Sequence, residues 1–362
     1  MAEHFNPGQT FFGTPKMPEG HRFDLKRLEN YLMDRIEGFR TPLDVRQFKG
    51  GQSNPTYELI TPCRRYVLRC QPRGKLLPSA HAIDREYRII SALYPTGFPV
   101  ARPHLLCDDQ SIVGSMFYVM EHVEGRICWE PLLPGQTQQQ RHAIYDAMNE
   151  TLAQLHSLDW RALGLEDFGR PGNYVARQIA RWTKQYRASE TERIEEMEKL
   201  IEWLPQHLPE APRDAIVHGD YRLDNMILHP SEPRVLAVID WELCTIGDPM
   251  ADFTYHLMQW QMPRNASKSG TTLLDADLRV LGVPSMDEYT AWYFARTHDE
   301  RPPELDYYAA YNFFRLAGIL QGIVGRVRDG TTTSIRAAEN VSRVRPLAEC
   351  GWHYARRAGA SG

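Results

Sequence analysis

The sequence predicts an α+β protein in which a small β-rich part precedes a larger helical part. Its 362 residues exceed the roughly 150 residues of a typical domain, which suggests about two domains or lobes. Hydrophobic residues make up 42% and charged residues 24%, the balance of a folded globular chain. Patterning typical of short strands gives way to helical periodicity near residue 123, and we expect the boundary between the two lobes there.

The first lobe is expected to be a small, mostly antiparallel sheet that carries one helix. Residues 1–40 are assigned to an arm and an amphipathic helix, because Leu25, Leu28 and Leu32 recur at helical spacing. Residues 41–122 form the lobe itself. Alternation and turn signals within it predict strands at 56–60, 65–69 and 116–120 and a helix at about 81–94.

Residues 123–362 are expected to form the helical lobe. Apolar positions at helical spacing predict a helix that ends near His156. One long polar helical stretch is predicted from about 174 to 203, within an insert at 159–213. Helices are expected from about 250 onward, and short strands are predicted at 215–217, 226–228 and 235–239.

The composition argues against several kinds of partner. Its 42 basic and 46 acidic residues give a net charge of −4, so nucleic acid is not expected as a partner. No apolar stretch reaches the roughly 18 residues of a spanning helix, and the first ten residues lack a basic region followed by an apolar one. We therefore expect a cytoplasmic protein that does not bind membranes. Six scattered cysteines without a C-x-x-C pair are expected to be free thiols.

The strongest chemical signal runs from His218 to Asn225 and continues at Asp240 and Glu242. Asp220 precedes an amide by five residues, and a second carboxylate follows at the end of the next predicted hairpin. Phosphoryl transfer from a metal nucleotide needs this set, because one carboxylate orients the acceptor hydroxyl while a carboxylate and an amide oxygen hold Mg²⁺. The alternatives are turn-capping roles for Asp220 and Asn225, or a metal site of another kind that uses His218 and Asp220.

These motifs resemble the aminoglycoside phosphotransferase family of the protein-kinase-like superfamily. The resemblance rests on H-G-D-x-x-x-x-N, I-D-W-E, a glycine-containing loop and a V-L-R strand. The nearest likeness is to phosphotransferase-like domains found alone in bacteria or fused to acyl-CoA dehydrogenases, and it rests on MFYVMEHVEGR, AVIDWELCTIGDPMADF and FFRLAGILQGIVGR. It covers roughly residues 40–330 and implies a bilobal protein-kinase-like fold that binds ATP, or GTP, with Mg²⁺ in the cleft between the lobes.

The resemblance implies roles for five residues of the central motif. Asp220 is the expected catalytic base, and Arg222 is expected to stabilise charge on the transferring phosphoryl group. Asn225 and Asp240 are the expected Mg²⁺ ligands, and Glu242 either adds to the metal site or orients Asp240.

Two neighbours of the motif are expected to be structural. His218 is expected to pack against the catalytic loop and hydrogen-bond it, and Asp252 is expected to brace that loop rather than touch substrate.

Arg69 stands where kinases usually carry the strand lysine that grips the α- and β-phosphates. Glu86 lies on the following helix, where the ion-pair partner of that cation is expected; its alternative role is a solvated helix charge. Arginine also binds phosphate well, although its planar fork differs from the point charge of lysine. Lys75 is the rival phosphate anchor.

Two further segments are expected to bind the nucleotide. The glycine-containing loop, an ordinary hairpin turn in the alternative view, is expected to cradle phosphate through backbone N–H groups. Its expected contacts are Gly50, Gly51, Ser53 and Asn54. The hinge between lobes is expected to bind adenine through Met120, Glu121 and Val123, and the alternative is a buried edge strand.

The acceptor is expected to be a small hydroxylated molecule rather than a protein. Gly219 stands where many protein kinases carry an arginine that receives an activation-loop phosphate, and no A-P-E segment follows Asp240. The insert at 159–213 is the expected source of acceptor specificity. Its aromatic residues are expected either to contact the acceptor or to form core, and they are Trp160, Tyr174, Trp182, Tyr186 and Trp203.

The class of acceptor is left open between a hydroxyacyl compound, another hydroxylated metabolite and an aminoglycoside. An aminoglycoside is polycationic and would need an acidic site. The acidic candidates are Glu190, Glu192, Glu195, Glu196 and Glu198, but interspersed Lys and Arg indicate a solvated helix face. The alternative function is a catalytically silent nucleotide-binding regulatory module, and a protein kinase is disfavoured. We expect the protein to be a monomer or a homodimer.

Overall fold

The computed structural model describes residues 23–48, 54–72, 82–209, 213–267, 271–299, 304–328 and 337–361. The chain divides into two compact units. Unit 1 consists of residues 1–129 and 224–244, and unit 2 consists of residues 130–223 and 245–362. Unit 1 holds a small antiparallel sheet and unit 2 is mostly helical, which confirms the predicted α+β class. The functional boundaries expected at residues 41, 123 and 159 stay predictions.

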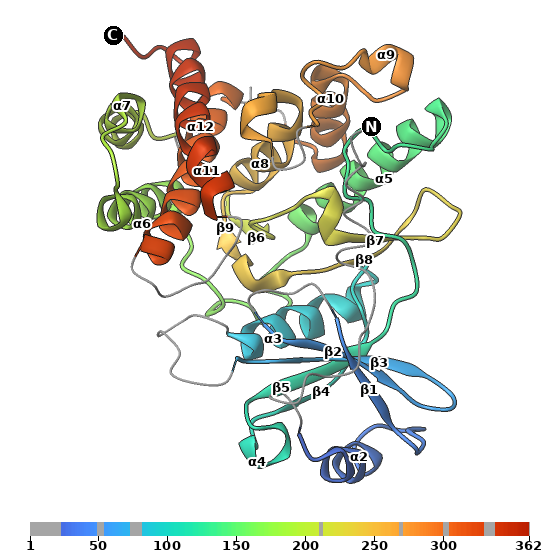
Figure 1. The fold of residues 1–362 in the computed structure, drawn as a ribbon. Helices are drawn as coiled ribbons and strands as arrows, with labels where there is room; N and C mark the ends of the chain where they lie inside the picture. Colours follow the sequence, from blue (N-terminus) through green and yellow to red (C-terminus); the bar gives the residue numbers. More distant parts are fainter. Residues whose placement is uncertain are drawn as a thin grey trace, which may run out of the picture. The chain divides into compact units, whose positions relative to one another are not determined.

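A five-stranded antiparallel sheet forms the centre of unit 1 (Figure 1). Its strands lie in the order β1 (Asp44–Gln47), β2 (Thr56–Ile60), β3 (Arg65–Cys70), β5 (Phe117–Glu121) and β4 (Pro103–Cys107). The strands predicted at 56–60, 65–69 and 116–120 are confirmed to within one residue. The two edge strands, β1 and β4, were not predicted, because one has a single apolar residue and the other begins with proline.

The two faces of this sheet lie against different helices. On one face, Tyr57 of β2 and Leu68 of β3 pack in a core with α2 (Leu25–Met33) and α4 (Gln110–Val113). Because successive side chains alternate between faces, Arg69 points to the other side of the sheet. Figure 1 shows α3 (Ile83–Leu93) on the side of the sheet opposite α2. The helix predicted at 81–94 is confirmed, with slightly narrower bounds.

A second hairpin, β7 (Met226–Leu228) and β8 (Val235–Val238), belongs to unit 1. Arg126 forms a β-bridge with Leu228, and the Val238 N–H donates to the Pro99 carbonyl at 2.8 Å. Trp241, in a 3₁₀ turn at Trp241–Leu243, packs edge-to-face on Phe98 at a centroid distance of 5.9 Å. These contacts fasten the segment that carries Asn225 and Asp240 to the rest of the unit.

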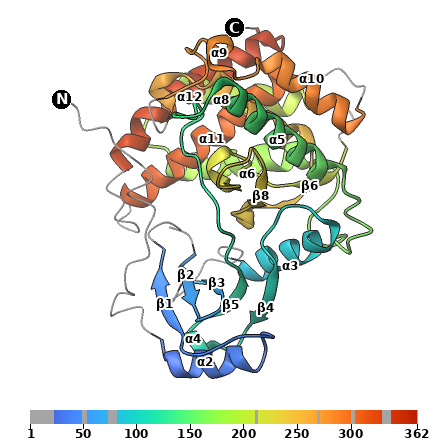
Figure 2. The same cartoon turned by 90° about the vertical axis from the view of Figure 1, so that its right-hand side faces the viewer.

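Unit 2 combines helices with a short two-stranded sheet (Figure 2). The short strands β6 (Ala215–Val217) and β9 (Thr245–Gly247) pair antiparallel. The helices are α5 (Gln138–Ser157), α6 (Tyr174–Ser189), α7 (Glu195–Trp203), α8 (Pro249–Gln261), α9 (Leu278–Leu281), α10 (Met286–Thr297), α11 (Leu305–Arg328) and α12 (Ala337–Arg357).

The helical stretch predicted from 174 to 203 is interrupted, because it consists of two helices, α6 and α7, separated by residues 190–194. Glu190 leaves the helical conformation at the end of α6, and the buried Ile194 is extended just before α7. α6 packs closely on α11, where a Cβ added at Gly325 would lie only 2.6 Å from Ser189 Cβ. Glycine therefore permits this helix contact.

The aromatic residues of the 159–213 insert form core. All five are at most 9% exposed: Trp160, Tyr174, Trp182, Tyr186 and Trp203. Of the two roles left open for them, the structure supports the packing role.

Of the helices in the described part of the chain, none combines the length and apolar character needed to cross a membrane.

Candidate functional site

The loop that carries Asp220 follows β6 in unit 2 and is held by a buried carboxylate. Asp252 on α8 accepts hydrogen bonds from the backbone N–H groups of His218 at 2.6 Å and Gly219 at 2.9 Å. Gly219 has φ +82°, a left-handed conformation that favours glycine. The sequence prediction that Asp252 braces this loop agrees with these contacts, and the conformation explains why residue 219 is glycine.

A buried histidine completes the support of Asp252. His156 Nε2 lies 3.2 Å from Asp252 Oδ2, and its Nδ1 lies 2.6 Å from the Tyr293 hydroxyl. Burial lowers the pKa of His156, so we assign a neutral ring that donates from Nε2 and accepts at Nδ1. Burial alone would raise the pKa of Asp252, but the contacts with His156 and the His218 N–H hold it below its usual value.

Asp220 itself is held by contacts within unit 2. The Tyr255 hydroxyl donates to Asp220 Oδ1 at 2.6 Å. Arg222 Nε lies 3.1 Å from the same oxygen, and the Asp220 N–H donates to His218 Nδ1 at 3.2 Å. His218 is fully buried, in keeping with its expected structural role.

Unit 1 contains a compact polar cluster centred on Glu86. Arg69 Nε lies 2.7 Å from Glu86 Oε2. Asn54 Nδ2 donates to Glu86 Oε1 at 2.9 Å, and the Tyr118 hydroxyl donates to Glu86 Oε2 at 3.1 Å. Burial opposes the charge of Arg69, but Glu86 together with Tyr118, Asp240 and Glu242 raises the pKa of Arg69 above its ordinary value. Glu86 is thus a buried ion-pair partner and not a solvated helix charge.

The expected metal ligands lie beside this cluster. Arg69 Nη2 donates to Asp240 Oδ1 at 3.1 Å. The Ile239 N–H donates to the Asn225 carbonyl at 2.9 Å, so the hairpin brings Asn225 next to Asp240. Asp240 has φ +67°, which turns the chain sharply at the end of β8. Glu242 is exposed, and its charge also favours the charged form of Arg69.

The donor set at this hairpin fits Mg²⁺. Carboxylate and amide oxygens are the ligands that Mg²⁺ takes in phosphoryl-transfer sites, and the side chains of Asn225 and Asp240 supply both kinds. Among the described residues no group of three His, Cys, Asp or Glu side chains gathers to hold a metal. The alternative metal site built on His218 and Asp220 therefore finds no support in this part of the chain.

Several expected nucleotide contacts lie outside the described residues. These are Gly50, Gly51, Ser53 and the rival anchor Lys75. Asn54, the last residue of the expected loop, is described and bonds Glu86.

The expected hinge lies at the end of β5. Glu121 N–H donates to the Arg102 carbonyl at 2.8 Å and His122 N–H to the Arg65 carbonyl at 3.4 Å. Because the N–H and carbonyl of one strand residue point to the same side, the Glu121 carbonyl points to the side of the Glu121 N–H, and Val123 follows two residues after the end of β5. Met120 pairs within the sheet with Val67.

Sequence reasoning missed two residues that contact the Asp220 loop. Tyr255 lies three residues after Asp252 on α8, so helical spacing from the bracing carboxylate was a usable signal. Arg315 on α11 donates from Nη2 to the Gly219 carbonyl at 2.6 Å, and it lies 93 residues beyond Arg222, with no local pattern to mark it.

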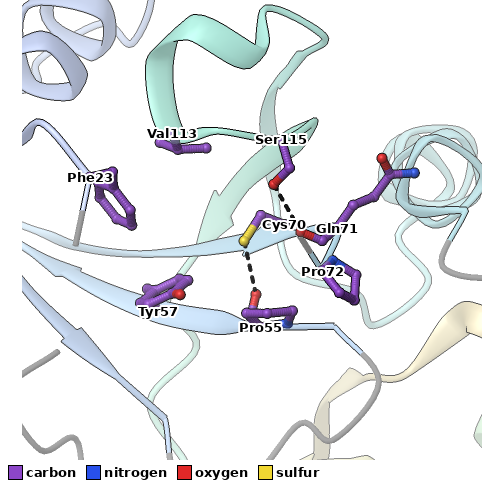
Figure 3. Close-up of a pocket in the computed structure, with 8 residues that line it drawn as sticks. All are labelled: Phe23, Pro55, Tyr57, Cys70, Gln71, Pro72, Val113 and Ser115. Atoms are coloured by element: carbon purple, nitrogen blue, oxygen red, sulfur yellow. Dashed lines mark hydrogen bonds between the residues drawn. The ribbon is translucent and has the colours of Figure 1, made fainter. Parts of the chain in front are cut away.

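A small pocket in unit 1 lies on the face of the five-stranded sheet opposite to the Arg69 side chain (Figure 3). It has a volume of about 200 Å³ and is lined by Phe23, Pro55, Tyr57, Cys70, Gln71, Pro72, Val113 and Ser115. Because Cys70 follows Arg69 on β3, their side chains point to opposite faces. This pocket is therefore separate from the Arg69 cluster.

The chain belongs to the phosphotransferase enzyme family, whose model matches residues 44–292. It is 44% identical over 337 residues to mouse acyl-CoA dehydrogenase family member 10, covering 92% of this chain and 31% of that protein. It is 41% identical over 343 residues to human acyl-CoA dehydrogenase family member 11, covering 93% of this chain and 44% of that protein. The chain thus spans less than half the length of these curated relatives.

Solved structures agree with this assignment. A candidate aminoglycoside phosphotransferase from Ralstonia eutropha is 49% identical with a TM-score of 0.85, covering 93% of this chain and 99% of that one. A spectinomycin phosphotransferase in complex with ADP and spectinomycin has a TM-score of 0.59 at 10% identity, covering 92% of this chain and 99% of that one. The second likeness concerns the fold alone, and together they confirm the predicted kinase-like fold.

Proposed function

We propose that this protein is an ATP- and Mg²⁺-dependent O-phosphotransferase that acts on a hydroxyl group of a small molecule. The observation that carries the proposal is the Arg69 guanidinium, which bonds both Glu86 and the expected metal ligand Asp240. A partly buried cation held between two carboxylates at the expected phosphate-gripping position is the arrangement that kinase-like chemistry uses. Family membership supports the general activity, and it leaves the acceptor open.

In this proposal unit 1 binds the nucleotide. The Glu121 carbonyl and Val123 N–H bind the adenine edge, with Met120 beside them. Arg69 binds the phosphates, and Glu86 keeps its side chain in place. The loop residues Gly50, Gly51, Ser53 and Asn54 are proposed to cradle phosphate through backbone N–H groups.

The residues proposed to hold Mg²⁺ are Asn225 and Asp240, with Glu242 in a supporting role. When bound, the ion neutralises negative charge that develops on the phosphate oxygens. Arg69 also limits the repulsion between the Asp240 carboxylate and the polyphosphate, because it bonds Oδ1 directly.

Unit 2 supplies the base in this proposal. Asp220 accepts a hydrogen bond from the acceptor hydroxyl, orients its oxygen toward the γ-phosphate and receives its proton. Arg222, at 3.1 Å from Asp220 and partly exposed, is proposed to stabilise charge on the transferring group.

The acceptor is proposed to be a hydroxyacyl compound or another hydroxylated metabolite rather than a polycation. The acidic residues of α7 and the preceding turn are engaged on the surface with arginines: Glu198 and Glu190 pair with Arg187, and Glu192 pairs with Arg345. An acidic run neutralised in this way offers little to a polycationic aminoglycoside.

The first experiment is thermal unfolding with ATP, GTP or ADP, each with and without Mg²⁺. A ligand that binds the native state raises its stability in proportion to RT ln(1 + [L]/Kd). We expect a metal-dependent rise with a nucleoside triphosphate, followed by transfer of radiolabelled phosphate from that nucleotide to one member of a panel of hydroxylated acyl compounds. No rise at millimolar nucleotide would refute the proposal. A rise with no transfer to any acceptor would favour a silent nucleotide-binding module.

A further inference from the structure

Two helices of unit 2 hold the Asp220 loop through side chains that have no assigned role in the proposed reaction. On α8, Asp252 and Tyr255 are one helical turn apart, so both face the loop. Asp252 accepts hydrogen bonds from the backbone N–H groups of His218 and Gly219, and the Tyr255 hydroxyl donates to the Asp220 carboxylate. On α11, Arg315 donates to the Gly219 carbonyl.

Both backbone polar groups of Gly219, the residue before Asp220, are hydrogen-bonded to side chains. The Gly219 N–H donates to Asp252 Oδ1 at 2.9 Å, and the Gly219 carbonyl accepts from Arg315 Nη2 at 2.6 Å. The carbonyl of Gly219 belongs to the peptide that joins it to Asp220. Arg315 therefore fixes the orientation of the peptide from which the Asp220 side chain projects.

Tyr255 acts on the carboxylate itself. Its hydroxyl donates to Asp220 Oδ1 at 2.6 Å, the length of a strong hydrogen bond to an ionised group. Burial and then the Asp220 charge raise the pKa of Tyr255, so the phenol keeps its proton and remains a donor. A donor fixed on one oxygen restricts rotation of the carboxylate about its Cβ–Cγ bond.

Arg315 also supports Tyr255. Its Cζ lies 5.0 Å from the centroid of the Tyr255 ring, within the range of a cation–π contact. Arg315 is only 5% exposed, and its Nε has no hydrogen-bond partner among the described residues. Burying a guanidinium against a neutral carbonyl is costly for stability. Such a cost is understandable where the buried charge lies behind a carboxylate that must be held in place.

We propose that Tyr255 and Arg315 are positioning residues for Asp220, Tyr255 by fixing the carboxylate and Arg315 by fixing its peptide and the Tyr255 ring. The inference rests on the proposed function, in which Asp220 is the base. In-line transfer is sensitive to such placement, since a displacement of about 1 Å can cost roughly 100-fold in rate.

The test measures ADP release from ATP and Mg²⁺ with water as the acceptor, in wild type and variants. Tyr255→Phe keeps the ring and deletes only the hydroxyl. We expect its kcat to fall about 10- to 100-fold while the KM for ATP changes less than about twofold. The matched control is Tyr307→Phe, which deletes a buried hydroxyl that donates to the Leu204 carbonyl at 2.9 Å. The control is expected to keep wild-type kcat.

Arg315 is tested in the same way. Arg315→Met is expected to lower kcat, and Arg315→Lys is expected to recover part of the loss, because lysine retains a charged donor. Arg343→Met is the control, since Arg343 Nε also donates to a backbone carbonyl, that of Ala266, at 2.6 Å.

A melting-temperature cycle checks the contact independently of turnover. Tyr255→Phe is expected to lower the melting temperature less in an Asp220→Ala background than in wild type; equal losses would overturn the contact. Normal kcat in Tyr255→Phe, with active wild type, would overturn the positioning role while sparing the proposed function. Absence of ADP release by the wild type, with water and with every member of the panel of hydroxylated acceptors, would refute the proposed function, and this inference with it.

Discussion

Arg69 Nη2 lies 3.1 Å from Asp240 Oδ1, although 171 residues separate them in the chain. The expected phosphate anchor and an expected metal ligand are thus joined within unit 1. In that contact Arg69 compensates the charge of Asp240, and Glu86 compensates the charge of Arg69 in turn. The charges of Asp240, Arg69 and Glu86 therefore depend on one another, and these side chains do not act independently on the nucleotide side of the proposed reaction.

The first prediction concerns the ion pair between Arg69 and the buried Glu86. Arg69→Met leaves the Glu86 carboxylate, whose side chain is 2% exposed, without its cation. Breaking a buried pair by removing one partner typically costs about 3–5 kcal/mol, so we expect the free energy of unfolding in urea to fall by about 3 kcal/mol. The exposed pair of Arg234 and Glu232 gives the control. Arg234→Met should change stability by at most about 1 kcal/mol, and an equal loss in both variants would contradict the prediction.

The second prediction separates the two expected metal carboxylates. Asp240→Asn removes a charge that bonds Arg69 and is proposed to hold Mg²⁺, whereas Glu242 is exposed and assigned a supporting role. We expect Asp240→Asn to abolish the Mg²⁺-dependent part of the ATP-induced rise in melting temperature. Glu242→Gln should reduce that part only modestly. If Glu242→Gln has the larger effect, the assignment of the metal ligands is reversed.

The sequence predicted the elements that carry strong periodic or motif signals. The strands around Arg69, the helix of Glu86 and the strand before His218 agree with the structure because their apolar residues follow one clear period. The edge strand at Pro103–Cys107 was missed because it starts with proline and its edge position weakens its pattern. Local patterning also overlooked the non-helical residues 190–194, with the buried Ile194, that interrupt the predicted helical stretch.

The site shows the same division between local and long-range information. The pairing of Arg69 with Glu86 could be inferred from the resemblance, and the geometry places both side chains together. Tyr255 was marked only by its helical spacing from Asp252, and its contact with Asp220 joins residues 35 positions apart. Arg315 could not be inferred, because its contact with Gly219 depends on how α11 packs and joins residues 96 positions apart.

The third prediction tests the base. Asp220→Asn keeps the size of the side chain but cannot accept the acceptor's proton. General-base catalysis contributes about 10²- to 10⁴-fold, so we expect phosphoryl transfer from ATP to fall by at least about 100-fold, while the ATP-induced rise in melting temperature stays within about 1 °C of wild type. Glu232→Gln on the surface is the control and should retain full activity. Retained activity in Asp220→Asn would remove the base assignment.

The last prediction concerns stability in acid and the buried His256. Its Nδ1 lies 3.2 Å from the Tyr221 carbonyl and its Nε2 lies 2.8 Å from the Tyr289 hydroxyl, an arrangement that suits a neutral ring. Burial lowers the pKa of His256 to about 4, below the value of about 6.5 in an unfolded chain. Between these two values the unfolded state binds the extra proton, so stability is fully present above about pH 6.5 and is lost as the pH falls toward 4.

From this shift alone, the wild type should lose about 2 kcal/mol of unfolding free energy between pH 7 and pH 5. His256→Gln retains a donor and an acceptor but does not titrate. We expect it to lose about 2 kcal/mol less than the wild type over this range, measured by urea unfolding at each pH. His353→Gln, at an exposed position, should follow the wild-type curve. Parallel curves for His256→Gln and wild type would show that this ring is not the group that titrates on unfolding.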